Sequence, residues 1–291
     1  METRELLKKI RKIEIRTKSL SRSLFAGEYH SAFKGKGISF NKVREYEPGD
    51  DVRSIDWNVT ARLNHPYVKV FEEERELTIM LLVDVSASSD FGTQTMLKRD
   101  LILELCAVLA FSAMNNNDKI GVLFYSTEVE KYIPPGKGKN HALKIIRELL
   151  ELKPRHKGTD IGVALHYLGR VEKKRCTAFI ISDFLDPGME KPLNLFGRKY
   201  DLIGLQIYDI REQEMPDLGL IHFKNTETGE VLLIDSSDKA MRRQYELNWR
   251  QHNERLDTLL RRTGVDHVRI RTDQSYVAPL LTLLRRRERK G

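Results

Sequence analysis

Five oxygen-bearing side chains occupy positions at which they could together bind a hard metal ion. They are Asp84, Ser86 and Ser88, in a D-x-S-x-S pattern directly after the run LTIMLLVDV, followed by Thr159 and Asp183. Carboxylate and hydroxyl oxygens suit Mg²⁺, Mn²⁺ or Ca²⁺ and suit zinc or copper poorly. Because Mg²⁺ keeps some of its water ligands, a carboxylate from another molecule could complete its coordination shell.

These residues can meet only if the segments that carry them are neighbours in one sheet. Apolar runs of strand length occupy 77–85, 119–126, 176–184 and 200–209, with shorter strands expected at EVEKYIP and DHVRIRT. Helical spacing is found at 94–114, 140–152, 160–170, 239–263 and 275–289. This alternation predicts a doubly wound, mainly parallel α/β sheet with helices on both faces. Function in such a sheet collects beyond the carboxyl ends of the strands.

The chain changes character at about residue 76. Residues 1–76 are predicted to hold a charged helix at 2–18 and then irregular, short-strand material with several Gly and Pro residues. Its apolar content is too thin for a core of its own, so we expect it to pack on the main domain, residues 77–291. Within that domain, the runs LGLIHF and VLLID flank NTETGE and predict a β-hairpin insertion at about 211–236.

The irregular segment of the N-terminal part carries its own charged pattern. Trp57 is expected to anchor this part on the main sheet, with recognition of a partner as the alternative role. Three arginines, Arg44, Arg53 and Arg62, could pair with three acids, Asp50, Asp51 and Asp56. Such pairs would hold the irregular backbone but would add little stability where they are exposed.

Composition excludes several classes of protein. The 291 residues include only two cysteines, Cys106 and Cys176, each inside an apolar run. They are expected to be small core residues, so a disulfide framework and a cysteine zinc site are excluded. No run approaches the ~18 apolar residues of a membrane helix, and the charged N-terminus is unlike a secretory signal. We therefore expect a cytoplasmic protein.

The net charge of +8 is concentrated at the two ends of the chain. Residues 1–70 carry +6 and residues 241–291 carry +7, whereas the middle carries −5. Basic ends could bind nucleic acid, an anionic membrane or an acidic protein, but solvated helix faces are the simpler interpretation. Aromatic residues are not interleaved with the basic runs, which disfavours a stacking platform for single strands.

Each feature of the oxygen-bearing set also has a plain structural interpretation. The D-x-S-x-S pattern and Thr159 could cap helices, and Asp183 could stand in a turn. Only their combination, at these intervals, favours a metal site. Asp160 could bond a metal-bound water, and Asp209 could support the site or contact a partner, although a cap is the simpler role for Asp209.

Catalytic alternatives fit the pattern less well. Ser86 stands where a haloacid-type phosphotransferase needs a second Asp, and G-x-S-x-G, P-loop and H-E-x-x-H motifs are missing from the sequence. A metal-dependent hydrolase would need a general base, for which His156 and Asp160 are the nearest candidates to Thr159.

The chain resembles two known groups of proteins. The five residues match, in order, the metal-ion-dependent adhesion site of von Willebrand factor A-like domains. The pieces REYEPGDDVRSIDWNVTAR, VFEEERE, MPDLGL and ETGE resemble the signature of the bacterial family called domain of unknown function 58 (DUF58). This second resemblance covers nearly the whole chain.

The resemblance implies a fold, a site and a partner. The fold would be a six-stranded von Willebrand A-like, Rossmann-like sheet with one antiparallel edge strand at KYIP. The site would bind Mg²⁺, or Mn²⁺ or Ca²⁺, through Asp84, Ser86, Ser88, Thr159 and Asp183, with a carboxylate of a client protein as a further ligand. The partner would be a MoxR-type AAA+ ATPase, for which the protein would be a chaperone-like adaptor.

We therefore expect a non-enzymatic, metal-dependent interaction module. A metal-dependent hydrolase that uses the same site and a basic nucleic-acid-binding protein are the alternatives. No nucleic-acid ligand is expected, and any membrane association would come through partners.

Overall fold

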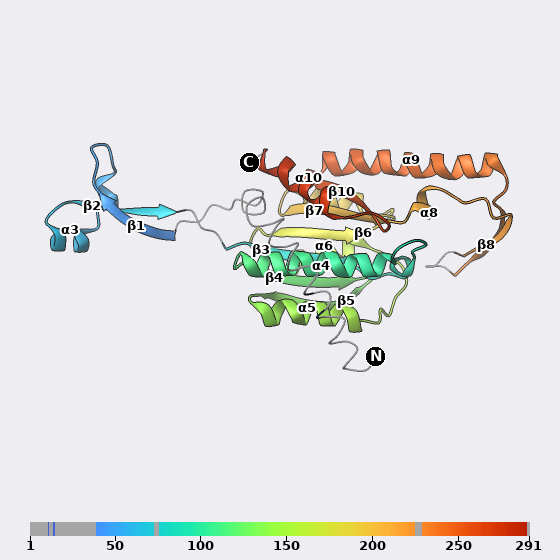
Figure 1. Cartoon of the computed structure of the whole chain (residues 1–291), viewed down its shortest axis with the longest axis horizontal. Coiled ribbons are helices and arrows are strands. Elements are labelled where there is room, and N and C mark those ends of the chain that lie inside the picture. The colour runs from blue at the N-terminus through green and yellow to red at the C-terminus, as the bar shows by residue number, and fades with distance from the viewer. Residues whose placement is uncertain (1–10, 12–13, 15–38, 73–75, 225–228, 290–291) are drawn as a thin grey trace. The chain divides into compact units, whose positions relative to one another are not determined.

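The computed structural model describes residues 11, 14, 39–72, 76–224 and 229–289 (Figure 1). The chain divides into two compact units, of which the smaller spans residues 33–77. The predicted helix at 2–18 lies outside the described residues except at two positions. The expected packing of the N-terminal part on the main domain stays a prediction.

The larger unit is built on a six-stranded sheet with the order β10-β7-β6-β3-β4-β5. The parallel strands are β3 (Thr78–Asp84), β4 (Lys119–Tyr125), β6 (Thr177–Ser182), β7 (Asp201–Tyr208) and β10 (Asp266–Arg271). Strand β5 (Val129–Gly136) is antiparallel to β4 at one edge. This order confirms the predicted doubly wound α/β fold and the antiparallel strand at KYIP.

Helices cover both faces of this sheet. They are α4 (Lys98–Asn115), α5 (Lys139–Glu151), α6 (Ile161–Val171), α7 (Glu190–Phe196), α9 (Lys239–Arg262) and α10 (Val277–Glu288). Side chains of α6, α7 and α9 form one apolar cluster with those of β3, β4, β6 and β7. Helix α4 is buried on nearly every side, which explains why it is apolar around most of its circumference.

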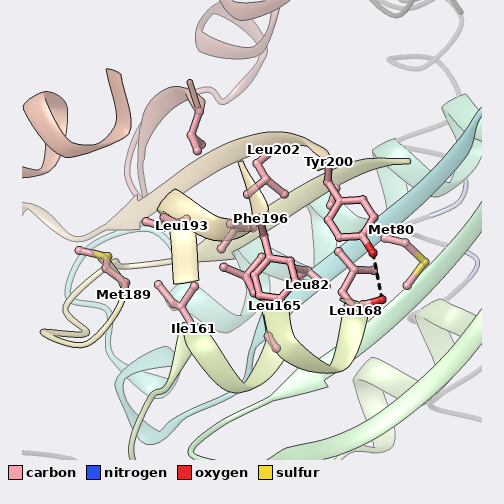
Figure 2. Packing of buried hydrophobic residues seen from close by; sticks show 14 of the residues in the cluster. Met80, Leu82, Ile161, Leu165, Leu168, Met189, Leu193, Phe196, Tyr200 and Leu202 are labelled. Carbon is pink, nitrogen blue, oxygen red and sulfur yellow. Dashed lines mark hydrogen bonds between the residues drawn. The ribbon is translucent and has the colours of Figure 1, made fainter. Parts of the chain in front are cut away.

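Figure 2 shows how the apolar cluster holds α6 on the sheet. Leu165 and Leu168 of α6 lie among side chains of β3 and α7, including Leu82 and Phe196, and all four are buried. The Tyr200 hydroxyl donates a hydrogen bond to the Leu168 carbonyl oxygen at 3.4 Å. This packing holds α6 against β3 and α7.

The helix predicted at 94–114 begins later, at Lys98. Residues before it form a loop because Thr93 is held by a residue far away in the sequence. The Thr93 backbone N–H and hydroxyl donate to the Asp209 carboxylate at 3.0 and 2.6 Å. The short helices α7 and α8 (Ile210–Gln213) were not predicted, since neither is long enough to show a helical period.

The predicted hairpin insertion is confirmed. Strands β8 (Leu220–Lys224) and β9 (Val231–Asp235) pair antiparallel in a two-stranded sheet of their own. Most of its side chains are exposed, among them Leu220 at 69% and Leu233 at 64%.

The smaller unit is a β-hairpin with two short helices between its strands. Strand β1 (Ser39–Glu45) pairs with β2 (Tyr67–Glu72), and η1 (Val52–Ser54) and α3 (Trp57–Leu63) connect them. The predicted Arg44–Asp50 pair is present, with two hydrogen bonds of 2.8 and 2.6 Å. These bonds lower the pKa of Asp50.

Asp51 and Asp56 form no ion pair with an arginine among the described residues, contrary to expectation. Asp51 and Asp56 instead accept backbone N–H groups at the starts of η1 and α3. Trp57 is 67% exposed, and its anchoring role stays a prediction.

Both cysteines are buried free thiols, which confirms that they are core residues. Burial raises the pKa of the Cys176 thiol to about 12. Within the described part of the chain, no helix is long and apolar enough to cross a membrane.

The packing of α6 yields a stability prediction. Leu165→Ala should lower the free energy of unfolding by about 2–5 kcal/mol, because it leaves a cavity in the cluster. Leu195→Ala on α7, where the side chain is 60% exposed, should change it by less than about 0.5 kcal/mol. Urea unfolding measures both, and equal losses would contradict this view of the core.

Candidate metal centre

The structure brings the predicted oxygen-bearing residues together at the switch point of the sheet. Strands β3 and β6 are parallel neighbours, although β4 and β5 lie between them in the sequence. Asp84 ends β3, and Asp183 directly follows β6. The Thr159 hydroxyl donates to Asp84 across 3.3 Å to Oδ2. Three distant segments therefore meet at one rim, where ligand sites of such sheets are found.

Asp84 is the centre of this group. Its side chain is buried, and the residue is only 3% exposed. Its Oδ1 accepts the Ser86 backbone N–H at 2.9 Å, and its Oδ2 accepts the Ser182 hydroxyl at 2.7 Å. The hydroxyl oxygens of Ser86 and Ser88 lie 3.0 Å apart beside it. Ser182, which the sequence interpretation overlooked, thus holds one face of the carboxylate.

Backbone contacts fix the loops that carry these side chains. Residues after β3 turn into η2 (Ala87–Asp90), and the Ala87 N–H donates to the Lys157 carbonyl oxygen at 2.9 Å. The Asp160 N–H donates to the Ser126 carbonyl oxygen, also at 2.9 Å. The loop that carries Thr159 is therefore tied on both sides to the loops after β3 and β4.

Asp183 makes a buried ion pair that the sequence did not reveal. Lys98, at the first turn of α4 and only 2% exposed, donates to Asp183 Oδ2 at 3.0 Å and to Glu212 Oε1 at 2.6 Å. A lysine at a helix start is ordinarily solvated, and no neighbouring residue signals its burial. Only the docking of α4 and α8 on the sheet brings these groups together.

Burial and neighbouring charges shift the pKa of Asp84, Lys98 and Glu212. Burial, and then the charge of Asp183, raises the pKa of Asp84 to about 6. Burial alone would lower the pKa of Lys98, but Asp183 and Glu212 raise it, so Lys98 is a cation near pH 7. Burial raises the pKa of Glu212. When all are ionised, three carboxylates and one ammonium leave two negative charges.

Asp160 and Asp209 both cap helices. Asp160 accepts the Val163 N–H at the start of α6. Asp209 forms a capping box with Glu212 on α8 and also binds Thr93 and Thr272. Burial would raise the pKa of Asp209, but these hydrogen bonds lower it below its ordinary value. Asp209 has no exposed surface for a partner.

The donor set fits a hard divalent cation. Among the described residues, no three His, Cys, Asp or Glu side chains group as metal ligands, so zinc chemistry has no support there. The predicted set instead offers two carboxylates and three hydroxyls. Asp84 is buried, yet the described residues supply it with no basic partner, in contrast to Asp183. Buried charges are normally paired or bound to metal ions.

Comparisons with known proteins support a family assignment. The family described as "Protein of unknown function DUF58" matches residues 42–255. An uncharacterized protein of Mycobacterium tuberculosis is 31% identical over 283 residues, which cover 96% of this chain and 89% of that protein.

Two solved structures illustrate the likeness at lower identity. BatB from Bacteroides thetaiotaomicron has a TM-score of 0.47 at 15% identity, covering 74% of this chain and all of that one. The SpRpn10 VWA domain has a TM-score of 0.37 at 11% identity, covering 73% and 95%.

The buried Lys98 yields a prediction about stability. Lys98→Met should lower the free energy of unfolding by about 3–5 kcal/mol, because it leaves Asp183 and Glu212 buried without a cation. Arg99→Met, at the next and more exposed position of α4, should cost less than about 1 kcal/mol. Chemical denaturation in EDTA distinguishes the two, and a tolerated Lys98→Met would contradict the paired arrangement.

The raised pKa of Asp84 yields a prediction about pH. The folded state holds the proton more tightly than the unfolded state, so Asp84 imposes a penalty that is absent below about pH 4 and complete above about pH 6. Asp84→Asn removes this penalty. In EDTA it should exceed wild type in stability at pH 7, by on the order of 2 kcal/mol, and lose that advantage near pH 4. If the difference in the free energy of unfolding between Asp84→Asn and wild type did not change with pH, the raised pKa of Asp84 would be contradicted.

Proposed function

Because this chain belongs to the DUF58 family, whose description assigns no function, we propose from its site that it is a metal-dependent protein-interaction module. In this proposal Asp84, Ser86, Ser88, Thr159 and Asp183 hold Mg²⁺, or Mn²⁺ or Ca²⁺. A carboxylate from another protein then becomes a further ligand of the ion. The ion supplies a positive charge that both proteins share.

The observation that carries the proposal is the buried carboxylate of Asp84. It accepts hydrogen bonds from Ser86 and Ser182, but the described residues place no cation beside it. When ionised, the group formed by Asp84, Asp183, Glu212 and Lys98 carries two net negative charges, which one divalent cation would balance. Binding that ion would offset the cost of keeping Asp84 ionised where water is excluded.

The arrangement supports binding better than catalysis. Ser86 and Ser88 contact one another, and the carboxylate beside Ser86 is that of Asp84, which is itself a proposed ligand of the ion. The groups around Asp84 instead hold it in place. Such a site recognises a partner carboxylate without chemical change to it.

A MoxR-type AAA+ ATPase is the partner that the family resemblance implies. The chain would then act as its adaptor and bind a client through the ion. Two features support this extension: the site at the rim of the sheet and the membership of DUF58.

Metal binding is tested by thermal unfolding. Mg²⁺ at 100 times its dissociation constant should stabilise the wild type by about 2.7 kcal/mol. It should not change the free energy of unfolding of Asp84→Ala. Asp90→Ala is the matched control, since Asp90 lies in the same turn but its side chain is 67% exposed. It should respond as wild type does, and an equal response of Asp84→Ala would overturn the proposed ligand set.

Partner binding is tested by co-purification. An AAA+ ATPase encoded beside the gene for this chain should be retained in Mg²⁺ and lost in EDTA or with Asp84→Ala. If the ATPase is retained both in EDTA and with Asp84→Ala, the metal does not bridge the two proteins.

Metal-dependent hydrolysis is a second candidate, favoured by one observation. His156 lies in the loop before Thr159, and its Nδ1 is 3.3 Å from Oε1 of Glu130, whose side chain is 3% exposed. A carboxylate can orient a histidine as a general base. A screen of phosphate esters with Mn²⁺ decides between the two, because turnover abolished by His156→Ala would favour the hydrolase.

A further inference from the structure

A cleft of about 200 Å³ opens beside Asp84 and Ser86. It lies between the start of α4, the end of α5 and the loop that follows α5. Its walls include two of the proposed metal ligands, so the cleft and the candidate metal centre are continuous. A chain segment whose carboxylate reached the ion would pass the mouth of this cleft.

The floor of the cleft is apolar. Ile102 of α4 and Leu149 of α5 are buried beneath it, and Leu152 and Pro154 line it closer to the solvent. An apolar cavity of about 150 Å³ is large enough to hold benzene. The cleft therefore has room for one aromatic or branched aliphatic side chain.

The rim of the cleft carries two basic side chains and one exposed acid. Arg99 and Lys157 line it, together with His156 and the exposed Asp90. Arg99 Nη2 donates to the Leu152 carbonyl oxygen at 3.1 Å, which keeps the guanidinium at the edge of the floor. Asp90 lies 3.7 Å from Arg99 and offsets part of its charge. Asp84 also lines the cleft, and the proposed ion would offset its charge, so that the positive charge of Lys157 favours an acidic segment over a basic one.

We infer that this cleft receives an apolar side chain of a partner, next to the carboxylate that reaches the metal centre. The inference rests on the proposed function and adds a partner class to it: an acidic segment in which Asp or Glu stands beside a large apolar residue. The carboxylate supplies the bond to the ion, and the apolar side chain supplies selectivity among acidic segments.

Two other cavities lack this combination. One is lined by α9 residues such as Glu254 and Arg262, and another by Asp257, Arg261 and Arg286. Both are larger, but their linings are mainly charged and contain none of the proposed metal ligands. Neither offers an apolar floor beside a place for a carboxylate.

Three short peptides test the inference on the full-length chain. The first probe is acetyl-Phe-Asp-Phe-amide, the second replaces both Phe with Gly, and the third replaces Asp with Asn. Their affinities are measured by ligand-observed NMR titration in Mg²⁺ and in EDTA. We expect the Phe probe to bind at least about tenfold more tightly than the Gly probe in Mg²⁺, because burial of one aromatic ring is worth at least that factor.

Variants locate the effect in the cleft. Leu152→Ala should reduce the Phe-to-Gly ratio, since it removes part of the floor, whereas Leu195→Ala on the exposed face of α7 should leave it unchanged. Lys157→Glu should weaken binding of both Asp-containing probes by charge repulsion and leave the Asn probe little affected.

The outcomes separate this inference from the function on which it rests. If the Phe and Gly probes bind equally in Mg²⁺ and not in EDTA, the metal-dependent site stands and the cleft inference is overturned. An unchanged ratio in Leu152→Ala would also overturn it. If no probe shows Mg²⁺-dependent binding that requires Asp, both proposals fall.

Discussion

The Asp84 carboxylate carries a negative charge into a place from which water is nearly excluded. In most buried sites such a charge is matched by a basic side chain, as Lys98 matches Asp183 here. Asp84 receives hydrogen bonds from a backbone N–H and from hydroxyls, which orient it but do not neutralise it. The need to balance this charge is the constraint on which the arrangement of the rest of the site depends.

The surroundings of Asp84 form one connected framework. Lys98 joins Asp183 to Glu212, and a Glu212 oxygen accepts the Asp209 N–H at 2.8 Å. Asp209 in turn binds Thr93, which holds the loop before α4. Segments from both sides of the switch point are thus linked through buried polar contacts. Such a framework can hold ligand oxygens in place before a cation arrives, which reduces the cost of binding.

The proposed function also explains why the described residues at the carboxyl edge of the sheet include few groups that could act in catalysis. An interaction module needs a positioned charge and a surface that selects among partners, and the cleft beside α4 and α5 offers such a surface. The exposed β8–β9 hairpin shows that apolar side chains also reach the solvent elsewhere in the larger unit. Shape and charge around the ion, and not reactivity, would then decide what is bound.

The sequence by itself determined the chain order of the strands and longer helices of the larger unit, and it identified the residues of the candidate site. Uninterrupted apolar runs require strands covered on both faces, and Asp84, Ser86, Ser88, Thr159 and Asp183 follow such runs or precede a helix. Local pattern was sufficient there because strand burial and capping depend on near neighbours in the chain.

The tertiary structure decided what neutralises and supports those residues. Lys98 and Glu212 reach the site only through the docking of α4 and α8 on the sheet, and their local sequences give no sign of it. Ser182 reaches it as the last residue of β6, next to Asp183. The loop before Lys98 and the cap at Asp209 likewise depend on a contact between residues 116 positions apart. Pairings over such distances are set by the packing of whole elements, which residue types and spacing do not encode locally.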